Sequence, residues 1–257
     1  MTKKEELKGK LESMAMTKEE LQGKLQSIAL PGKDIKYSEL EEIASALFND
    51  FQIDKNGKRY DFVEIEFYIY NEKHPDAITY KRECEAGYWF FHPSGVDIAF
   101  KSELKDYKEG TTKKKIGYGG GILIRSISTI ENNELRVICG PIKCEEELFD
   151  KFNAFEKDET YPIIVEREEK LEKPLEIKIK SCPRYINNTK GDSYIQTKCE
   201  NWGYKNEEVM KEYLSKNYRF YDADYEVSET EKSKNEIWNK YAAKPKIGYI
   251  PKGFKIT

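Results

Sequence analysis

The chain has 257 residues, enough for one large domain or two small ones, of which 38% are hydrophobic and 35% charged. Its 18 Tyr, 12 Phe and 3 Trp exclude a disordered chain, because they provide ample core-forming side chains. The formal net charge of −3 excludes a strong overall attraction to phosphate. Any nucleic-acid binding therefore requires a local basic surface.

Membrane insertion and metal binding are not indicated by the sequence. No apolar run approaches the length of a membrane span, and residues 1–10 lack the apolar stretch of a signal peptide. We therefore expect a cytoplasmic protein without a membrane partner. The five cysteines include no Cys-x-x-Cys pair, and His74 and His92 are the two histidines. These counts predict reduced thiols, no metal site and no cofactor.

The first thirty residues contain a tandem repeat, MTKKEELKGKLESMA followed by MTKEELQGKLQSIA. Each copy opens with Thr-x-x-Glu, the capping box that marks a helix start, and continues with apolar residues at helical spacing. We expect residues 1–33 to form a duplicated helical appendage that is dispensable for folding and through which an oligomer is possible. Residues 34–257 are then expected to form a single domain.

The remaining elements are strands in the middle of the chain and helices at both ends. A capping box and a clean apolar stripe predict a helix at 38–51, and Asn56-Gly57 predicts a tight turn within 54–59. Strands are predicted at 61–70, 88–92, 95–101, 121–128, 135–140 and 175–180, and further helices at 145–155, 206–217 and 232–241. This order predicts an α+β fold, a single domain around a curved mixed or antiparallel sheet with flanking helices.

The predicted strand at 61–70 has two different faces. Its apolar residues occupy alternate positions: Val63, Ile65, Phe67 and Ile69. The polar residues between them are Glu64, Glu66, Tyr68 and Tyr70. Because side chains alternate along a strand, the first set predicts a core face. The second set predicts either a solvated outer face or the wall of a site.

Arg125 follows the same alternation in the predicted strand at 121–128, where we place it on the face of Leu123 and Ile127. A buried arginine needs a partner. Its alternatives are a structural salt bridge to Glu64 or Glu66, or a position that binds phosphate or orients an acid. The three glycines at 119–121 allow the backbone to approach another group closely.

The basic segment KDYKEGTTKKKIGYGG, residues 105–120, is the best candidate for a nucleic-acid surface, with a solvated loop as its alternative. The aromatic segment YWFFH, residues 88–92, predicts a strand that turns at Pro93-Ser94-Gly95. If this strand shares a sheet with 61–70, one of its rings faces Tyr68. The slot between the two rings then suits a flat heterocycle.

These segments together resemble the alkyladenine (3-methyladenine) DNA glycosylase family. The resemblance lies in I-E-F-Y at 65–68, the histidine that follows, the aromatic strand turning into GVDIAF, and the strand GGILIRSI. It covers about residues 60–130. It implies that family's mixed α+β fold around a curved sheet, like the C-terminal domain of methionyl-tRNA formyltransferases. It also implies cleavage of the N-glycosidic bond of a modified or flipped purine.

The resemblance implies a role for five residues. Glu66 is the general base, Tyr68 and Phe91 stack on the base, and His74 reaches its other side. Arg125 corresponds to the arginine beside the phosphate backbone. Such chemistry needs a carboxylate that activates water and a stacked pocket for the extruded base.

Three further positions qualify this set. Glu64 is a rival base, or a like-charge neighbour that raises the pKa of Glu66. Lys101 stands where the family has a pocket asparagine, and Ser94 stands where its DNA-binding members have an intercalating aromatic residue. A nucleoside or a single strand is therefore a second kind of substrate.

Two other kinds of protein are compatible with the same residues. One is a non-catalytic protein of this fold that binds a nucleotide or a nucleic-acid end, with Arg125 and the lysines at 113–115 holding phosphate. The other is a structural protein that self-associates through the N-terminal repeat.

Overall fold

The computed structural model describes residues 15–109, 112–132, 134–150, 155, 161–167, 177–184, 191–202, 212–227, 237–239 and 247–248. The helices are α2 (Lys18–Ser27), α3 (Tyr37–Asn49), α4 (Pro141–Leu148) and α5 (Gly191–Trp202). The strands of the first half are β1 (Phe51–Lys55), β2 (Lys58–Asn71), β3 (His74–Pro75), β4 (Trp89–His92), β5 (Gly95–Ala99), β6 (Glu103–Glu109) and β7 (Thr112–Glu131). Those that follow are β8 (Glu134–Cys139), β9 (Ile163–Glu166), β10 (Ile179–Cys182), β11 (Arg219–Asp222), β12 (Tyr225–Val227), β13 (Ile237–Asn239) and β14 (Ile247–Gly248).

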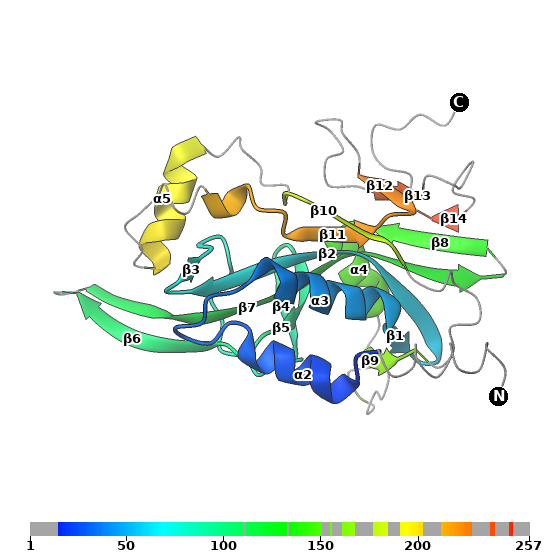
Figure 1. Ribbon diagram of the computed structural model, residues 1–257, viewed down its shortest axis with the longest axis horizontal. Helices are drawn as coiled ribbons and strands as arrows, with labels where there is room; N and C mark the ends of the chain where they lie inside the picture. The colour runs from blue at the N-terminus through cyan, green and yellow to red at the C-terminus, as the bar shows by residue number, and fades with distance from the viewer. Residues whose placement is uncertain are drawn as a thin grey trace.

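Twelve of the described strands join in one curled sheet, whose main path is β10-β11-β2-β7-β5-β4 (Figure 1). The pairs along this path are antiparallel, and β14 adds to β8 in parallel. Strands β12 and β13 form a separate pair. The molecule is therefore a mixed α+β protein with a mainly antiparallel sheet, as the order of predicted elements indicated.

The long strands β2 and β7 lie side by side at the centre of the sheet. The expected turn before β2 is present, since Asn56 and Gly57 have φ angles of 55° and 77° and join β1 to β2 in a hairpin. Positive φ at both central residues is the geometry that an Asn-Gly pair adopts most readily. The predicted strand 61–70 is therefore confirmed, and it is longer than expected at both ends.

A pair of β-bulges changes which side chains share a face of this strand pair. Val63 is an extra residue in β2 between Phe62 and Glu64, and Arg125 is an extra residue in β7 beside it. As a result, Val63 leaves the main core and packs in a small separate cluster, while Ile127 joins the main core. The expectations that Val63 faces the core with Ile65, and that Ile127 shares the face of Arg125, are therefore wrong.

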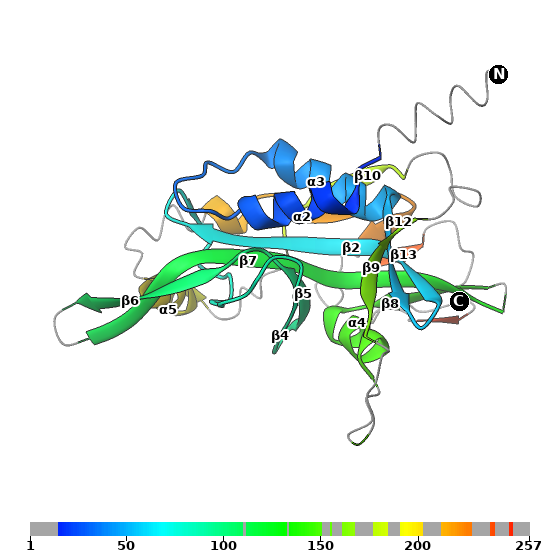
Figure 2. The same ribbon diagram turned by 90° about the horizontal axis from the view of Figure 1, so that it is seen from below.

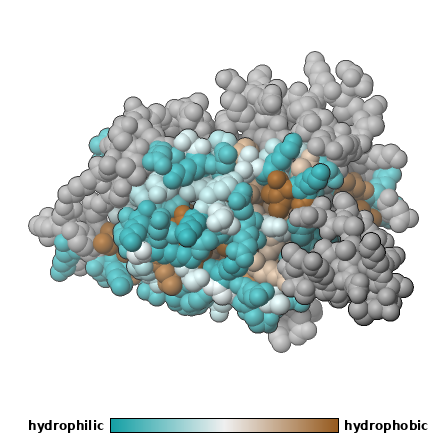
Figure 3. Space-filling view, in the orientation of Figure 1, coloured by the Kyte–Doolittle hydropathy of each residue, from teal (hydrophilic) through white to brown (hydrophobic). Residues whose placement is uncertain are grey.

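The apolar face of the sheet packs against α2 and α3, which lie together on one side of it (Figure 2). Phe67 lies at the centre of this core, with its ring 5.4 Å from the ring of Phe220 and 6.4 Å from that of Phe100. The predicted helix at 38–51 is confirmed as α3, and its apolar stripe is buried. The outer surface of the two helices is mostly hydrophilic (Figure 3), as expected for amphipathic helices on a sheet. None of the described helices is both long and apolar enough to cross a membrane.

The second copy of the N-terminal repeat is part of this core. It forms α2, with the capping box of Thr17 and Glu20 in place, and buries Leu21 and Leu25 against the main cluster. The boundary expected at residue 33 is therefore wrong for residues 15–33, because the apolar face of α2 is covered only when it packs on the sheet domain. The first copy lies outside the described residues up to residue 14.

Several other predicted elements need correction. The described part of the predicted helix at 232–241 is the strand β13, whose Ile-Trp pair suits a strand that pairs with β12. Helix α4 begins four residues earlier than expected and ends at Leu148. The described residues of 105–120 belong to strands, since 105–109 form most of β6 and 112–120 form the first part of β7. Helix α5 and strand β11 were not predicted. Half of the predicted helix at 206–217 lies outside the described residues, and in the other half residues 212–214 are helical.

The burial of α2 gives a direct test of its role in the core. Leu25→Ala should lower the free energy of unfolding by about 2–5 kcal/mol, the usual cost of truncating a buried leucine. The measurement is urea denaturation followed by circular dichroism. Gln22→Ala, on the exposed side of the same helix, is the control and should change the stability by less than about 0.5 kcal/mol. Equal effects of the two changes would restore the interpretation of α2 as an appendage.

Candidate functional site

Glu64 and Glu66 are both fully buried, at 0% exposure, on the side of β2 that faces away from the apolar core. Arg125 lies between them. Its Nε donates to Glu64 Oε1 at 3.0 Å and its Nη1 donates to Glu66 Oε2 at 3.2 Å. The expected partner of Arg125 is therefore present, and the polar side of β2 is not a solvated surface. Burial alone would lower the pKa of Arg125, but the charges of Glu66 and Glu64 raise it above its ordinary value.

Glu64 is held by three groups. Arg219, on the neighbouring strand β11, donates from Nε to Glu64 Oε1, and Ser126 donates from its hydroxyl to Oε2 at 2.8 Å. Burial raises the pKa of Glu64, but the charges of Arg219 and Arg125 outweigh this and leave the pKa below its ordinary value. Glu64 is therefore an ionised structural carboxylate with both oxygens occupied.

Glu66 differs from Glu64 because one of its oxygens is free. Oε2 accepts hydrogen bonds from Arg125 and from the Tyr68 hydroxyl at 2.8 Å. Oε1 is buried and has no hydrogen-bond partner among the described residues. Burial, together with the negative charge of Glu66, raises the pKa of Tyr68 well above its ordinary value, so Tyr68 remains a donor at neutral pH.

Arg184 lies over the ring of Tyr68, whose hydroxyl donates to Glu66. Its guanidinium carbon is 4.6 Å from the centre of the Tyr68 ring, a cation–π contact. Two of its nitrogens bind the carboxylate of Asp76, at 2.6 and 3.1 Å. The third, Nε, is buried and has no partner among the described residues. This arginine therefore connects Asp76 to the site of Glu66.

Arg82 and Asp97 form a second buried ion pair on the same side of the sheet. Asp97 and Glu66 both pair with Leu123, so their side chains share this side, and Arg82 Nη1 lies 2.7 Å from Asp97 Oδ2. A Cβ atom at Gly121 would approach Arg82 Nη1 to 2.8 Å, so only glycine leaves room for this guanidinium. The sequence predicted that another group approaches the backbone closely at the three glycines. At Gly121 that group is the guanidinium of Arg82.

We call this side of the sheet the charged face. It contains four buried arginines and four buried carboxylates: Arg82, Arg125, Arg184, Arg219, Glu64, Glu66, Asp76 and Asp97. The formal charges of the eight side chains cancel. Glu66 Oε1, Arg82 Nη2 and Arg184 Nε nevertheless lack hydrogen-bond partners among the described residues. Arg82 Nη1 likewise has no hydrogen bond within the described part of the chain and keeps only its ion-pair contact with Asp97. Several polar atoms of the array are thus without a hydrogen bond there, which is unusual for buried polar atoms.

His74 lies at the edge of the charged face and is enclosed by two tyrosines. Its ring stacks on Tyr218 at 5.6 Å and meets Tyr213 edge-on at 4.4 Å, and Tyr218 Oη lies 3.2 Å from Nε2. Burial and the nearby charges of Lys216 and Arg184 lower the pKa of His74 to about 3. His74 is therefore neutral and already packed against two rings.

Phe91 and Lys101 do not join the other predicted site residues. Phe91 pairs with Val96, next to Asp97, so it points to the opposite side of the sheet from Glu66. It is 49% exposed, and its ring packs against Phe149 at 4.8 Å. Lys101 pairs with Glu85, with 2.6 Å between nitrogen and oxygen. The slot expected between Phe91 and Tyr68 is therefore not formed.

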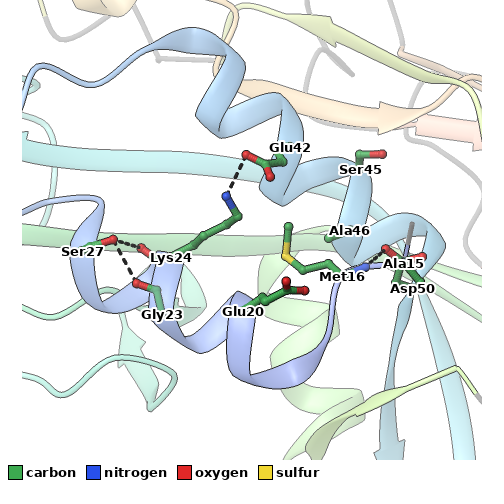
Figure 4. A pocket seen from close by; sticks show the side chains of 10 residues that line it. All are labelled: Ala15, Met16, Glu20, Gly23, Lys24, Ser27, Glu42, Ser45, Ala46 and Asp50. Carbon is green, nitrogen blue, oxygen red and sulfur yellow. Dashed lines mark hydrogen bonds and ion pairs between the residues drawn. The ribbon is translucent and has the colours of Figure 1, made fainter. Parts of the chain in front are cut away.

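A cavity of about 560 Å³ lies elsewhere, between α2 and α3 (Figure 4). Lys24 and Glu42 bridge it with an ion pair at 2.7 Å, and the Met16 amide donates to Asp50 at its end. None of the predicted site residues lines this cavity. Within the described ranges, no group of three or more His, Cys, Asp or Glu side chains is arranged to hold a metal ion.

Sequence reasoning missed five of the eight residues of the charged face: Arg82, Arg184, Arg219, Asp76 and Asp97. Asp76 and Asp97 lie in segments read as a strand end and an aromatic hairpin, and Arg184 and Arg219 lie more than a hundred residues beyond β2. Two unpaired glutamates in a buried strand were the available signal, because they require more than one arginine as partners. Which arginines those are depends on the pairing of β11 with β2, and this pairing has no local signature.

Comparison with known proteins gives little further information. No model of a known protein family matches the chain. It is 30% identical over 141 residues to the uncharacterized protein L759 of Acanthamoeba polyphaga mimivirus. This match covers 48% of the chain and 64% of L759, so the chain matches less than two thirds of that relative.

The ion pairs of Arg125 predict a large cost for its removal. Arg125→Ala leaves Glu64 and Glu66 buried without their shared partner and should destabilise the fold by about 3–5 kcal/mol. Arg59→Ala is the control, since Arg59 makes a partly exposed salt bridge to Asp54 at 3.0 Å and should cost less than about 1 kcal/mol. Urea melts of the two variants make the comparison. If Arg125→Ala lowered the free energy of unfolding as little as Arg59→Ala does, the ion pairs of Arg125 would not be needed for the stability of the fold.

The buried His74 predicts a loss of stability in mild acid. Its pKa of about 3 in the folded protein lies below the ordinary 6.5, so protons bind preferentially to the unfolded chain as the pH falls below about 6.5. Below pH 6.5 the free energy of unfolding should fall by about 1.4 kcal/mol for each pH unit. The protein should therefore be about 2 kcal/mol less stable at pH 5 than at pH 7.5. His74→Gln should remove most of this pH dependence in urea melts at pH 5 and 7.5. If His74→Gln and the unchanged protein lost stability equally between pH 7.5 and pH 5, titratable groups other than His74 would cause the loss.

Proposed function

We propose that the charged face binds the phosphates of a nucleotide or of a nucleic-acid end. The observation that carries the proposal is that two arginine nitrogens, Arg82 Nη2 and Arg184 Nε, have no hydrogen-bond partner in the described part of the chain. Guanidinium groups bind phosphate with paired, charge-assisted hydrogen bonds, and phosphate supplies acceptors for several donors at once. The unpartnered Glu66 Oε1 then accepts a hydrogen bond from a hydroxyl, an amino group or a water of the same ligand.

Each buried polar atom without a partner costs about 1–3 kcal/mol, and native proteins contain few of them. A ligand that supplies both acceptors and donors recovers this cost. The neutral sum of the array also agrees with a site that holds its arginines in place before the ligand arrives.

A second candidate is hydrolysis of an N-glycosidic bond with Glu66 as the general base. The arrangement that favours it is the asymmetry of Glu66, since Oε2 is fixed by Arg125 and Tyr68 while Oε1 remains available to activate water. This candidate is the one that the resemblance to alkyladenine glycosylases implies. It includes the fold implied there, a sheet like that of the C-terminal domain of methionyl-tRNA formyltransferases. The positions of Phe91 and His74 speak against it, because they leave Tyr68 as the one predicted stacking ring beside Glu66. Phosphate binding is therefore the better supported function.

Binding is tested by calorimetry with ATP, inorganic pyrophosphate and adenosine. ATP and pyrophosphate should bind and adenosine should bind much more weakly, because phosphate provides the contacts. Arg82→Lys keeps the charge beside Asp97 but removes Nη2, so it should weaken ATP binding at least about tenfold, the value of one hydrogen bond to a charged group. Arg59→Lys is the matched control and should have no effect. The proposal fails if neither phosphate compound binds, or if Arg82→Lys binds ATP as the unchanged protein does.

Catalysis is tested by release of free base from alkylated single-stranded DNA, duplex DNA and nucleosides. If Glu66 is a general base, Glu66→Gln should lower the rate at least about a hundredfold while leaving ATP affinity nearly unchanged. Absence of release by the unchanged protein on all three substrates would exclude the hydrolase and leave binding alone.

A further inference from the structure

Strand β6 and the first part of β7 form a two-stranded ribbon that projects from the body of the sheet (Figures 1 and 2). The register pairs Glu103 with Tyr118 at the base and Glu109 with Thr112 near the tip. Pairing of β7 with β2 and β5 covers residues 119–128, so the described part of the ribbon continues β7 beyond the sheet. The described residues of the segment predicted as a candidate nucleic-acid surface therefore form a two-stranded arm rather than the alternative, a solvated loop.

Glycines mark the place where the arm leaves the sheet. Gly119 and Gly120 have φ angles of 145° and 151°, which favour glycine. A Cβ atom at Gly120 would lie 1.9 Å from the carbonyl oxygen of Tyr68, and one at Gly117 would lie 1.9 Å from that of Glu103. The backbone is thus closely fitted here, and the arm starts from a defined point of the sheet.

The arm has the opposite charge from the rest of the chain. Between residues 103 and 118 the sequence has five lysines and three acidic residues: Lys105, Lys108, Lys113, Lys114, Lys115, Glu103, Asp106 and Glu109. The formal charge of this segment is therefore +2, in a chain whose total is −3. Lys105 and Lys108 are exposed. The arm is a local basic surface of the kind that a chain of negative net charge needs for binding nucleic acid.

The register of the arm contains one like-charge pair and one opposite-charge pair. Lys108 pairs with Lys113, and Asp106 pairs with Lys115. Like charges directly opposite each other destabilise a strand pair. The Lys108–Lys113 pair therefore does not serve the stability of the ribbon, and an anion bound beside it would relieve the repulsion.

We propose that this arm enters the major groove of duplex DNA. A two-stranded β-ribbon fits the major groove, which is about 12 Å wide, and is too broad for the minor groove at about 6 Å. The lysines of its two strands then supply positive charge for the phosphates along the groove. The major groove of duplex RNA is too narrow and deep for such an entry, so DNA is the preferred duplex. The arm is separate from the charged face, and this inference does not depend on the proposed function of that face.

Lysines on an exposed strand edge also prevent edge-to-edge association of sheets. The two roles have different consequences. If the lysines only protect the edge, replacing them leaves DNA affinity unchanged and makes the protein self-associate. If they bind DNA, replacing them weakens binding and reduces its dependence on salt.

The test is fluorescence anisotropy with a labelled 20-base-pair DNA duplex, its single strand and an RNA duplex of the same sequence. We expect the DNA duplex to bind most tightly. The variant Lys113→Gln/Lys114→Gln/Lys115→Gln should bind it at least tenfold more weakly at low salt. The slope of log affinity against log salt should fall by up to about 2.7, which is about 0.9 for each of three phosphate contacts.

The control variant replaces three exposed lysines outside the arm, Lys18, Lys73 and Lys180, with Gln and so makes the same change in net charge. It should bind the DNA duplex nearly as the unchanged protein does. ATP binding should be the same in both variants, which separates this inference from the proposed function of the charged face. The inference is overturned if the DNA duplex does not bind, if RNA or the single strand binds as tightly, or if the two variants are equally impaired. It is also overturned if the arm variant keeps its affinity and self-associates in sedimentation.

Discussion

The contact of Arg125 with both Glu64 and Glu66 is the interaction on which the rest of the structure depends. Two carboxylates on one buried strand repel each other and lose their hydration, and the guanidinium of Arg125 between them offsets both costs. The bulge at Arg125 turns this side chain out of the apolar core and toward them. Arg219 completes the neutralisation from β11 and thereby ties a strand from the last fifth of the chain to the central pair.

The two sides of the sheet consequently perform different tasks. The side covered by α2 and α3 is apolar and supplies the area buried from water, which is the main source of stability. The charged face brings together segments that are far apart in the chain, because Glu64 binds Arg125 and Arg219 and Asp76 binds Arg184. Its aromatic residues add to this ordering, as Trp202 of α5 stacks on Tyr70 at 3.8 Å. A site built on this face is held on strands and ion pairs rather than on loops, which favours a fixed geometry.

The sequence predicted the local features of this fold better than its long-range pairing. Helix α3, the Asn-Gly turn and strand β2 were recognisable because capping, turn chemistry and alternation act within a few residues. The bulge at Val63 has no such signature, so the faces of Val63 and Ile127 were misassigned. Burial of α2 was also missed, since an amphipathic helix shows that it packs on a surface but not which surface.

The candidate site was predictable to a similar extent. Glu66, Glu64, Tyr68 and Arg125 were expected near one another, and the structure brings these four together. Phe91 was expected beside them, but the register of β4 with β5 places it on the other side of the sheet, where a shift of one residue would have reversed it. Arg184 and Asp76 were not expected, because an ion pair between residues 108 positions apart leaves no trace in the local sequence.

The central claim is that the charged face is a ligand site and not only a set of structural ion pairs. A crystal structure of the protein grown with ATP tests it most directly. The account predicts phosphate oxygens within hydrogen-bond distance of Arg82 Nη2 and Arg184 Nε, with Glu66 Oε1 contacting the ligand or a water held by it. Density that shows ordered waters on these three atoms, with ATP absent or bound elsewhere, would contradict it.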